Sequence, residues 1–279
     1  MALRFLIIEG NTRTARDRYA AAYGRMPSEA YATALQEIVA DAVLDLTFPA
    51  DEGANLPGSR GLGAYDAVFV TGSALNVYDA EPAVTRQLDL MGAVFDSGVP
   101  AFGSCWGLQL ATVAAGGEVR PNPRGREIGF ARNIAPTAAG REHPLMAGRP
   151  AAFAAPASHI DTVTALPEGA VVLASNAISE VQAAEIRHGN GVFWGVQYHP
   201  EYTLAELASL IERRAKPLAA EGFFATIEDA ASYVADLRAL DADPSRTDLA
   251  WRHGLDAETL DPILRRRELR NFIEHQVGR

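Results

Sequence analysis

The strongest chemical signal in this chain is Cys105, the only cysteine among 279 residues. It stands in Gly103-Ser-Cys-Trp-Gly107, between an apolar run that ends at Phe102 and a stretch typical of a buried helix face. In a Gly-x-Cys-x-Gly turn from strand to helix, the cysteine takes the place of the serine in a hydrolase nucleophile elbow. The free N–H groups and positive dipole end of the following helix favour a thiolate. We therefore predict a nucleophile, although a lone cysteine is more commonly a small buried apolar residue.

A base for this nucleophile is provided by His199-Pro-Glu201, which follows the apolar run 192–197. A cysteine nucleophile needs a base within hydrogen-bond reach, and the base needs a third group that fixes its tautomer. Pro200 ends the strand and turns the chain, so that the Glu201 carboxylate can approach the imidazole. The sequence therefore predicts a triad of Cys105, His199 and Glu201.

The two motifs resemble the signatures of class I, or triad-type, glutamine amidotransferases. Residues 103–109 read Gly-Ser-Cys-Trp-Gly-Leu-Gln and residues 195–201 read Gly-Val-Gln-Tyr-His-Pro-Glu. The likeness is greatest to the amidotransferase domain of GMP synthase and its free-standing relatives. Further matches follow in the family's order, at residues 70–79, 127–129, 143–145 and 158–161. The resemblance covers about residues 1–215 and implies a flavodoxin-like α/β fold.

The resemblance also implies a role for each matching residue. Cys105 would attack the side-chain amide of glutamine, His199 would transfer the proton, and Glu201 would orient His199. Backbone N–H groups of Trp106 and of the Gly72–Ser73 loop would bind the oxyanion, and such donors are commonly worth about 10²–10³ in rate. The residues expected to hold the glutamine are Gln109, Ser158, His159, Ile160 and Asp161. No metal or other cofactor is implied.

Two departures from the family pattern bear on the substrate. Ser73 and Ala74 replace a glycine and a proline of the oxyanion loop. If Ser73 must adopt a positive φ, the strain would cost roughly 1–2 kcal/mol. If it need not, its backbone N–H can still bind the oxyanion, because the donor is not the side chain. Ile160 replaces a glycine and would narrow the glutamine site. Free-standing γ-glutamyl peptidases of the same superfamily tolerate a Gly-Ser version of this loop, so another γ-glutamyl substrate stays open.

Three functions follow from these motifs. The first is a glutaminase that releases ammonia for a separate synthetase subunit, since the chain has no Gly-x-x-x-x-Gly-Lys-Ser/Thr phosphate loop and no pyrophosphatase loop. The second is a stand-alone γ-glutamyl hydrolase, which differs only in the leaving group. The third is a silent regulatory protein, which the intact triad disfavours. His159 and Asp161 form an alternative base pair, but their segment matches a substrate-holding loop.

Composition excludes several classes of protein. The formal net charge of −10 argues against a nucleic-acid partner. A single cysteine rules out an internal disulfide framework and a Cys-rich zinc site. No apolar run approaches the roughly 20 residues of a membrane span, and residues 1–10 fit a first buried strand better than a signal peptide. We expect a soluble, cytoplasmic protein with no membrane partner.

The order of elements predicts an α/β fold. Strand-like runs at 5–8, 67–70, 99–102, 170–174 and 192–197 are mixed with helical stretches at 29–44, at 84–95 and around Gln109. Such a pattern favours a mostly parallel central sheet flanked by helices on both faces. The 71–73 loop, Cys105 and His199 all follow strands, so they should meet at one sheet edge. Residues 120–134 are expected to enter an antiparallel excursion.

We divide the chain into an amidotransferase domain, residues 1–220, and a helical C-terminal extension, residues 221–279. Thr226 is a predicted cap for one helix of the extension, and Asp261-Pro262 begins a second. The basic cluster Arg265–Arg267 is expected to be a solvated helix face. Its alternatives are a homo-oligomer contact and a docking face for a synthetase.

Overall fold

The first apolar run becomes β1 (Arg4–Ile8), an interior strand of a large sheet, in the computed structural model, which describes residues 2–54 and 61–278. The described strands of this sheet lie in the order β2-β1-β3-β4-β11-β10-β9-β6-β7. From β2 to β11 the neighbours are parallel, and from β11 to β7 they are antiparallel. The other strands are β2 (Val43–Thr47), β3 (Ala67–Val70), β4 (Ala101–Ser104), β6 (Glu127–Pro136), β7 (Phe153–His159), β9 (Val171–Ser175), β10 (Ala183–His188) and β11 (Gly191–Val196). A separate antiparallel pair joins β5 (Glu118–Pro121) to β8 (Asp161–Ala165).

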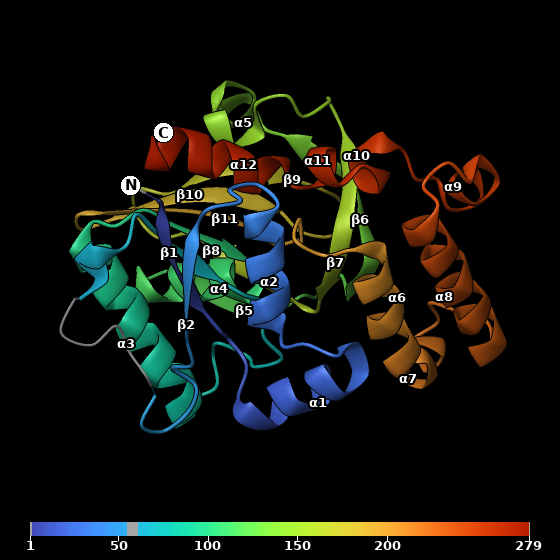
Figure 1. The fold of residues 1–279 in the computed structure, drawn as a ribbon, viewed down its shortest axis with the longest axis horizontal. Coiled ribbons are helices and arrows are strands. Elements are labelled where there is room, and N and C mark those ends of the chain that lie inside the picture. The colour runs from blue at the N-terminus through green and yellow to red at the C-terminus, as the bar shows by residue number, and fades with distance from the viewer. Residues whose placement is uncertain (1, 55–60, 279) are drawn as a thin grey trace.

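Helices cover both faces of the sheet (Figure 1), as the alternating pattern predicted. They are α1 (Arg13–Tyr23), α2 (Pro27–Gln36), α3 (Pro82–Ser97), α4 (Trp106–Ala114), α5 (Ala138–Glu142), α6 (Leu204–Arg213), α7 (Ala215–Ala220), α8 (Ile227–Ala242), α9 (Thr247–His253), α10 (Ala257–Leu260), α11 (Pro262–Arg265) and α12 (Arg267–Phe272). The α/β class is confirmed. No helix within the described part of the chain is long and apolar enough to cross a membrane.

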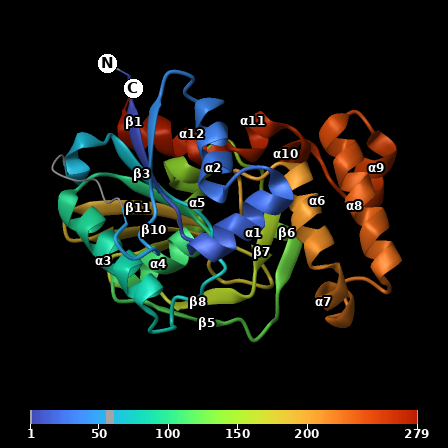
Figure 2. The ribbon, with the colours of Figure 1, turned by 60° about the horizontal axis from the view of Figure 1, so that its bottom comes forward.

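The alternation of side chains along β1 separates two cores. Phe5 and Ile7 face a cluster that includes residues of α2 and α12, whereas Leu6 and Ile8 face a cluster built with α3 and α4. Figure 2 shows the sheet between these two pairs of helices. A third cluster lies between α6 and α8. Because both faces are covered, the central strands are apolar throughout, as parallel strands in α/β folds usually are.

The C-terminal helices are present as predicted, and α12 returns to the sheet. The Phe272 ring lies 5.4 Å from that of Phe69 and 5.5 Å from that of Phe102, between ring centroids. A buried ion pair of 2.6 Å joins Arg149 to Glu268, whose other carboxylate oxygen accepts a 2.6 Å hydrogen bond from Tyr198. The α12 helix is thus part of the main core, and the division at residue 220 stays a prediction.

Two local predictions were wrong. The helix predicted for 29–44 ends at Gln36, because the Val43 N–H donates to the Leu3 carbonyl and begins a parallel strand beside β1. Arg265 and Arg266 are buried rather than solvated. The Arg265 guanidinium donates to the Thr259 carbonyl, and Arg266 forms an ion pair with a glutamate of the turn after α2.

The predicted helix starts are confirmed. Thr226 caps α8 by accepting from the Asp229 N–H at 3.0 Å, and Asp261 caps α11 by accepting from the Ile263 N–H at 2.7 Å. The second predicted helix is interrupted at Arg266 and continues as α12.

Candidate active site

Cys105 lies between β4 and α4 in a strained backbone conformation. Its φ of 53° and ψ of −99° fall where residues with a Cβ are rare, at a cost of order 1–3 kcal/mol. The turn is held by the Cys105 N–H, which donates to the Val196 carbonyl at 2.7 Å. Gly103 is required because a Cβ there would lie 2.8 Å from the Gly107 Cα. The predicted elbow is therefore present, with both of its glycines packed against neighbouring backbone.

His199 follows β11 and forms a buried pair with Glu201. The His199 Nδ1 and the Glu201 Oε1 are 2.7 Å apart, and the His199 N–H donates to the Pro156 carbonyl at 2.7 Å. An Nδ1–H that donates to the carboxylate leaves Nε2 with a lone pair, the tautomer that a base requires. The ring of Tyr202 stacks on the imidazole, with centroids 4.0 Å apart and planes within 4° of parallel. This packing holds the imidazole in one orientation.

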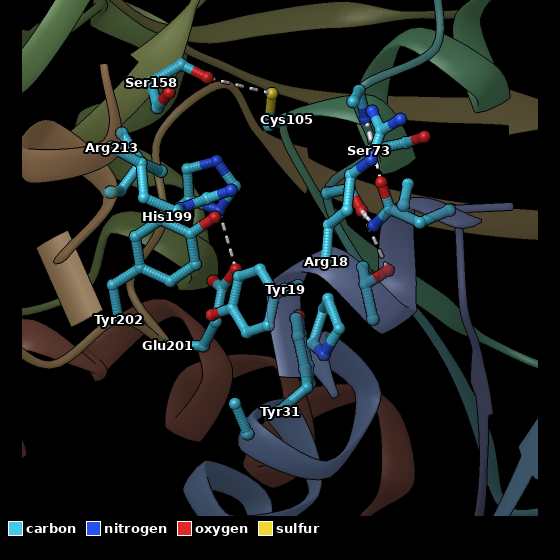
Figure 3. Close-up of a pocket in the computed structure, with 18 of the residues that line it drawn as sticks. Arg18, Tyr19, Tyr31, Ser73, Cys105, Ser158, His199, Glu201, Tyr202 and Arg213 are labelled. Carbon is cyan, nitrogen blue, oxygen red and sulfur yellow. Dashed lines mark hydrogen bonds and ion pairs between the residues drawn. The ribbon is translucent and has the colours of Figure 1, made fainter. Parts of the chain in front are cut away.

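The surroundings of His199 favour its protonated form. Burial lowers the pKa of His199, but the Glu201 carboxylate and a hydrogen bond with Cys105 outweigh that effect and raise it to about 10. The carboxylate beside the imidazole therefore stabilises a proton on His199. Figure 3 shows Cys105, His199 and Glu201 beside the same cavity.

A buried hydroxyl chain extends behind Glu201. The Ser104 hydroxyl donates to the Glu201 Oε2 at 2.8 Å, and the Tyr31 hydroxyl lies 3.3 Å from the Ser104 oxygen. Because the Ser104 proton is given to the carboxylate, Tyr31 is the donor to Ser104. The sequence prediction missed both residues. Ser104 had one signal, its place directly before the nucleophile, and Tyr31 had none.

The predicted oxyanion loop packs directly against the base. A Cβ on Gly72 would lie 2.7 Å from the His199 Cε1, so only glycine fits there. Ser73 is not among the residues with positive φ, which in the described chain are Cys105 and Asn133 besides glycines. The strain considered for Ser73 is therefore absent. Its hydroxyl donates to the Gly10 carbonyl at 2.8 Å and braces the loop.

Buried polar groups after β1 hold this loop. Glu9 accepts from the backbone and side chain of Asn11 at 3.0 and 2.9 Å, and from the Ser28 N–H at 2.9 Å. Asn11 in turn donates to the Gly72 carbonyl and accepts from the Ala74 N–H, at 3.1 and 3.0 Å. Burial raises the pKa of Glu9, partly offset by these hydrogen bonds. The Gly72–Ser73 backbone is thereby fixed, as an oxyanion site requires.

The remaining residue predicted to bind the oxyanion, Trp106, begins α4. Amide groups in the first turn of a helix have no partner within the helix, so its N–H can serve a ligand. The Trp106 side chain is fully buried and donates to the Gln87 side-chain oxygen at 2.9 Å. The indole therefore anchors the start of the helix.

Two cavities meet at Cys105. The first, of about 210 Å³, is bordered by His199, Tyr202, Tyr19 and Gly72, and we call it the His199 cavity. The second, of about 300 Å³, is bordered by Gln109 and by the 158–161 segment, and we call it the Gln109 cavity. Ser73 and Ser158 border both. Every predicted site residue except Trp106, which lies behind the nucleophile, borders one cavity or the other.

The predicted substrate residues line the Gln109 cavity. Gln109 is buried and donates to the Gln197 side-chain oxygen at 3.2 Å. The Ser158 carbonyl accepts from the Cys105 thiol at 3.9 Å, which places this backbone directly over the nucleophile. Ile160 is 42% exposed at the rim, where its side chain borders the cavity without filling it.

His159 and Asp161 are engaged elsewhere and do not form a second base pair. The His159 Nε2 lies 3.0 Å from a carboxylate oxygen of Glu127, and its Nδ1 lies 3.0 Å from the Asp161 backbone carbonyl. The Asp161 carboxylate accepts from the Tyr78 hydroxyl at 3.1 Å, and burial raises its pKa. These contacts shape the 158–161 segment. Within residues 2–54 and 61–278, no three His, Cys, Asp or Glu side chains gather as a metal site.

Comparisons with known proteins place the chain in one family. The model of the family described as glutamine amidotransferase class-I matches residues 38–216. The chain is 38% identical to a γ-glutamyl-L-1-hydroxyisopropylamide hydrolase of Pseudomonas sp, over 99% of this chain and 93% of that protein. It is 35% identical to the glutamine-hydrolyzing GMP synthase of Thermomicrobium roseum, over 52% of this chain and 25% of the synthase. The chain thus matches only a quarter of the synthase's length.

Solved structures show the same fold. A glutamine amidotransferase from Thermotoga maritima superimposes with a TM-score of 0.66 at 18% identity, covering 100% of both chains. One from Methylobacillus flagellatus superimposes with a TM-score of 0.53 at 20% identity, covering 75% of this chain and 74% of that one.

Proposed function

Because the chain belongs to the class I glutamine amidotransferase family, we propose that it hydrolyses a γ-glutamyl amide through a thioester on Cys105. The observation that carries this proposal is the placement of a strained Cys105 and a buried His199–Glu201 pair on one cavity. Members of the family act through such a nucleophile and base. The products are glutamate and the amine of the amide.

The proposed reaction has two halves. The Cys105 sulfur attacks the γ-carbonyl carbon while its proton passes to the His199 Nε2, and the carbonyl oxygen becomes an oxyanion. Backbone N–H groups of Trp106 and the Gly72–Ser73 loop stabilise that charge. His199 then protonates the nitrogen, the C–N bond breaks, and the amine leaves a γ-glutamyl thioester. A water molecule, deprotonated by His199, attacks the thioester, and the thiol is restored as glutamate departs.

Two observations support a leaving amine larger than ammonia. The relative with 38% identity matches this chain over almost its whole length and is named as a hydrolase of a substituted γ-glutamyl amide. The His199 cavity, at about 210 Å³, also exceeds what ammonia would occupy, since one molecule the size of water needs only about 10–15 Å³ by the same measure. We therefore place a stand-alone γ-glutamyl amide hydrolase first.

A glutaminase that supplies ammonia to a separate synthetase is the second candidate. The similarity to GMP synthases and the family match over residues 38–216 support it. It uses the same triad and the same thioester, so the two candidates differ only in the amine that leaves.

A paired assay separates the candidates. Intact-mass spectrometry after incubation with 6-diazo-5-oxonorleucine should show one adduct on the natural chain and none on Cys105→Ala. Glutamate release is then compared between glutamine, γ-glutamylethylamide and γ-glutamylglycine. We expect at least one substituted amide to exceed glutamine in kcat/KM. Faster release from glutamine would favour the second candidate, and no adduct with no release would refute both.

A further inference from the structure

The two cavities at Cys105 take different halves of the substrate. His199 must give its proton to the leaving nitrogen, so the amine lies on the side of the nucleophile that His199 borders. His199 borders the His199 cavity and not the Gln109 cavity. On the proposed function, the γ-glutamyl group therefore occupies the Gln109 cavity and the leaving amine occupies the His199 cavity.

Arginine side chains border the cavity assigned to the amine. They are Arg18 on α1, Arg213 at the end of α6, and Arg214, which borders both cavities. Figure 3 places Arg213 on the His199 side of the cavity and Arg18 on the Ser73 side. Glu201 is the one carboxylate among the described residues that border this cavity. Its two oxygens already accept hydrogen bonds from His199 and Ser104.

These arginines have no carboxylate partner in the part of the chain that the structure describes. The Arg213 guanidinium donates to the Tyr23 hydroxyl at 3.1 Å and lies 5.1 Å from the centre of that ring. The guanidinium groups of Arg18 and Arg214 form no ion pair or hydrogen bond within residues 2–54 and 61–278. By contrast, Arg16 and Arg25, nearby in sequence, pair with carboxylates at 2.5 and 2.9 Å.

Arg214 is the most buried of the three. It is half-buried, and burial together with its neighbours Arg126 and Arg213 lowers its pKa. The chain has ten more acidic than basic residues, yet these three arginines have no carboxylate partner among the described residues. Their mutual repulsion beside Cys105 raises the free energy of the site when no anion is bound. A bound anion would remove that cost.

We propose that the leaving amine carries a carboxylate, which the guanidinium groups of Arg213 and Arg214 bind, with Arg18 facing them across the cavity. This rests on the proposed function and narrows it. The substrate class is a γ-glutamyl amino acid or short γ-glutamyl peptide, and hydrolysis yields glutamate and an amino acid or peptide.

The experiment compares two substrates that differ only in the charge of the amine. The leaving group is glycine in γ-glutamylglycine and glycinamide in γ-glutamylglycinamide, which has nearly the same size. We expect kcat/KM of the natural chain to favour the carboxylate by about 10–100-fold, the usual range for a charge-assisted hydrogen bond. Equal values for the two substrates would overturn the proposal and leave the proposed function standing.

The variants Arg214→Gln and Arg213→Gln identify the groups that bind the carboxylate. Each should reduce the ratio of the two kcat/KM values toward one, and Arg213→Lys should keep part of it because the charge remains. Arg238→Gln, an exposed arginine paired with Glu212 on the outer face, is the matched control and should keep the full ratio. A variant that slows both substrates equally would show that its arginine holds the glutamyl carboxylate, which would contradict the proposal.

Binding to Cys105→Ala gives a readout that does not depend on turnover. Calorimetry should show tighter binding of γ-glutamylglycine than of γ-glutamylglycinamide, and Arg213→Gln, whose side chain lies at the surface, should remove the difference. If the natural chain hydrolyses neither compound, and neither glutamine nor γ-glutamylethylamide, the proposed function fails. The arginine assignment is then still decided, because equal or absent binding of the two compounds would refute it.

Discussion

Glu201→Gln is the change that tests the electrostatics of the site most directly. The substitution keeps the size of the side chain and removes one negative charge that lies against His199, with 2.7 Å between Nδ1 and Oε1. The substitution also changes which ring nitrogen of His199 carries the proton. Since Ser104 donates to the other oxygen, the amide of the new glutamine turns its NH₂ toward His199 and favours the proton on Nε2, the wrong nitrogen for a base.

The size of the pKa change can be estimated from the separation of the two charges. Each charge is spread over its group, so the charge centres lie farther apart than the two contacting atoms, and two unit charges about 4 Å apart attract by about 4 kcal/mol at an effective dielectric constant of about 20. That energy corresponds to about 3 pKa units. The variant should therefore lower the pKa of His199 from about 10 to roughly 7. The kcat/KM for a γ-glutamyl amide should fall by about 10²–10⁴, because the imidazolium formed in the reaction loses its counter-charge.

The measurement is an NMR titration of ¹⁵N-labelled histidine, with the His199 signals assigned by their loss in His199→Gln. Glu185→Gln is the matched control, because Glu185 also accepts from a histidine, His143, at 3.1 Å, outside the site. It should leave the His199 titration in place. A shift of less than about 0.5 unit in Glu201→Gln, or a loss of activity as complete as in Cys105→Ala, would refute this account of the charge.

Because the pKa of His199 is raised in the folded protein, its protonation stabilises the fold fully below pH 6.5, the ordinary pKa of histidine, and this stabilisation is lost as the pH rises through about 10. Urea unfolding should therefore show a larger loss of unfolding free energy for Glu201→Gln at about pH 7 than at about pH 10.5. Cys105→Gly should be about 1 kcal/mol more stable than Cys105→Ala by thermal unfolding, because glycine relieves the positive φ. Gly72→Ala should lower kcat/KM by about 100-fold or more in steady-state assays, since its Cβ would displace the imidazole. Glu268→Gln removes one of the two carboxylates that pair with the buried Arg149 and leaves Glu258 in place, so it should cost about 1–3 kcal/mol in chemical denaturation.

The parts of the site that the sequence could predict are those written as contiguous motifs. The elbow at Cys105 and the pair of His199 and Glu201 each lie within a few residues, so the local backbone largely determines their geometry. The strand runs were also predictable, because a strand buried on both faces leaves a continuous apolar signal.

The residues that the prediction missed are brought in by tertiary packing. Tyr31 reaches Ser104 from a helix that lies 73 positions earlier in the chain, and no local pattern marks that meeting. The three arginines of the His199 cavity look like ordinary surface charges in the sequence, since only the fold shows that they face one cavity. Arg266 was predicted to be solvated for the same reason, because its partner lies 229 positions away.

The position of α12 in the core has a consequence for the order of folding during synthesis. Cys105, His199 and Glu201 are all made well before residues 267–273, yet one face of the sheet beneath them is closed by Leu269, Phe272 and Ile273. Until that helix emerges from the ribosome, Phe69, Phe102 and Trp194 lack part of their cover, and exposed apolar surface of this kind invites aggregation. A nascent chain interrupted after Glu201 would thus carry Cys105, His199 and Glu201 without a finished core, and its uncovered apolar surface would be open to chaperones and proteases.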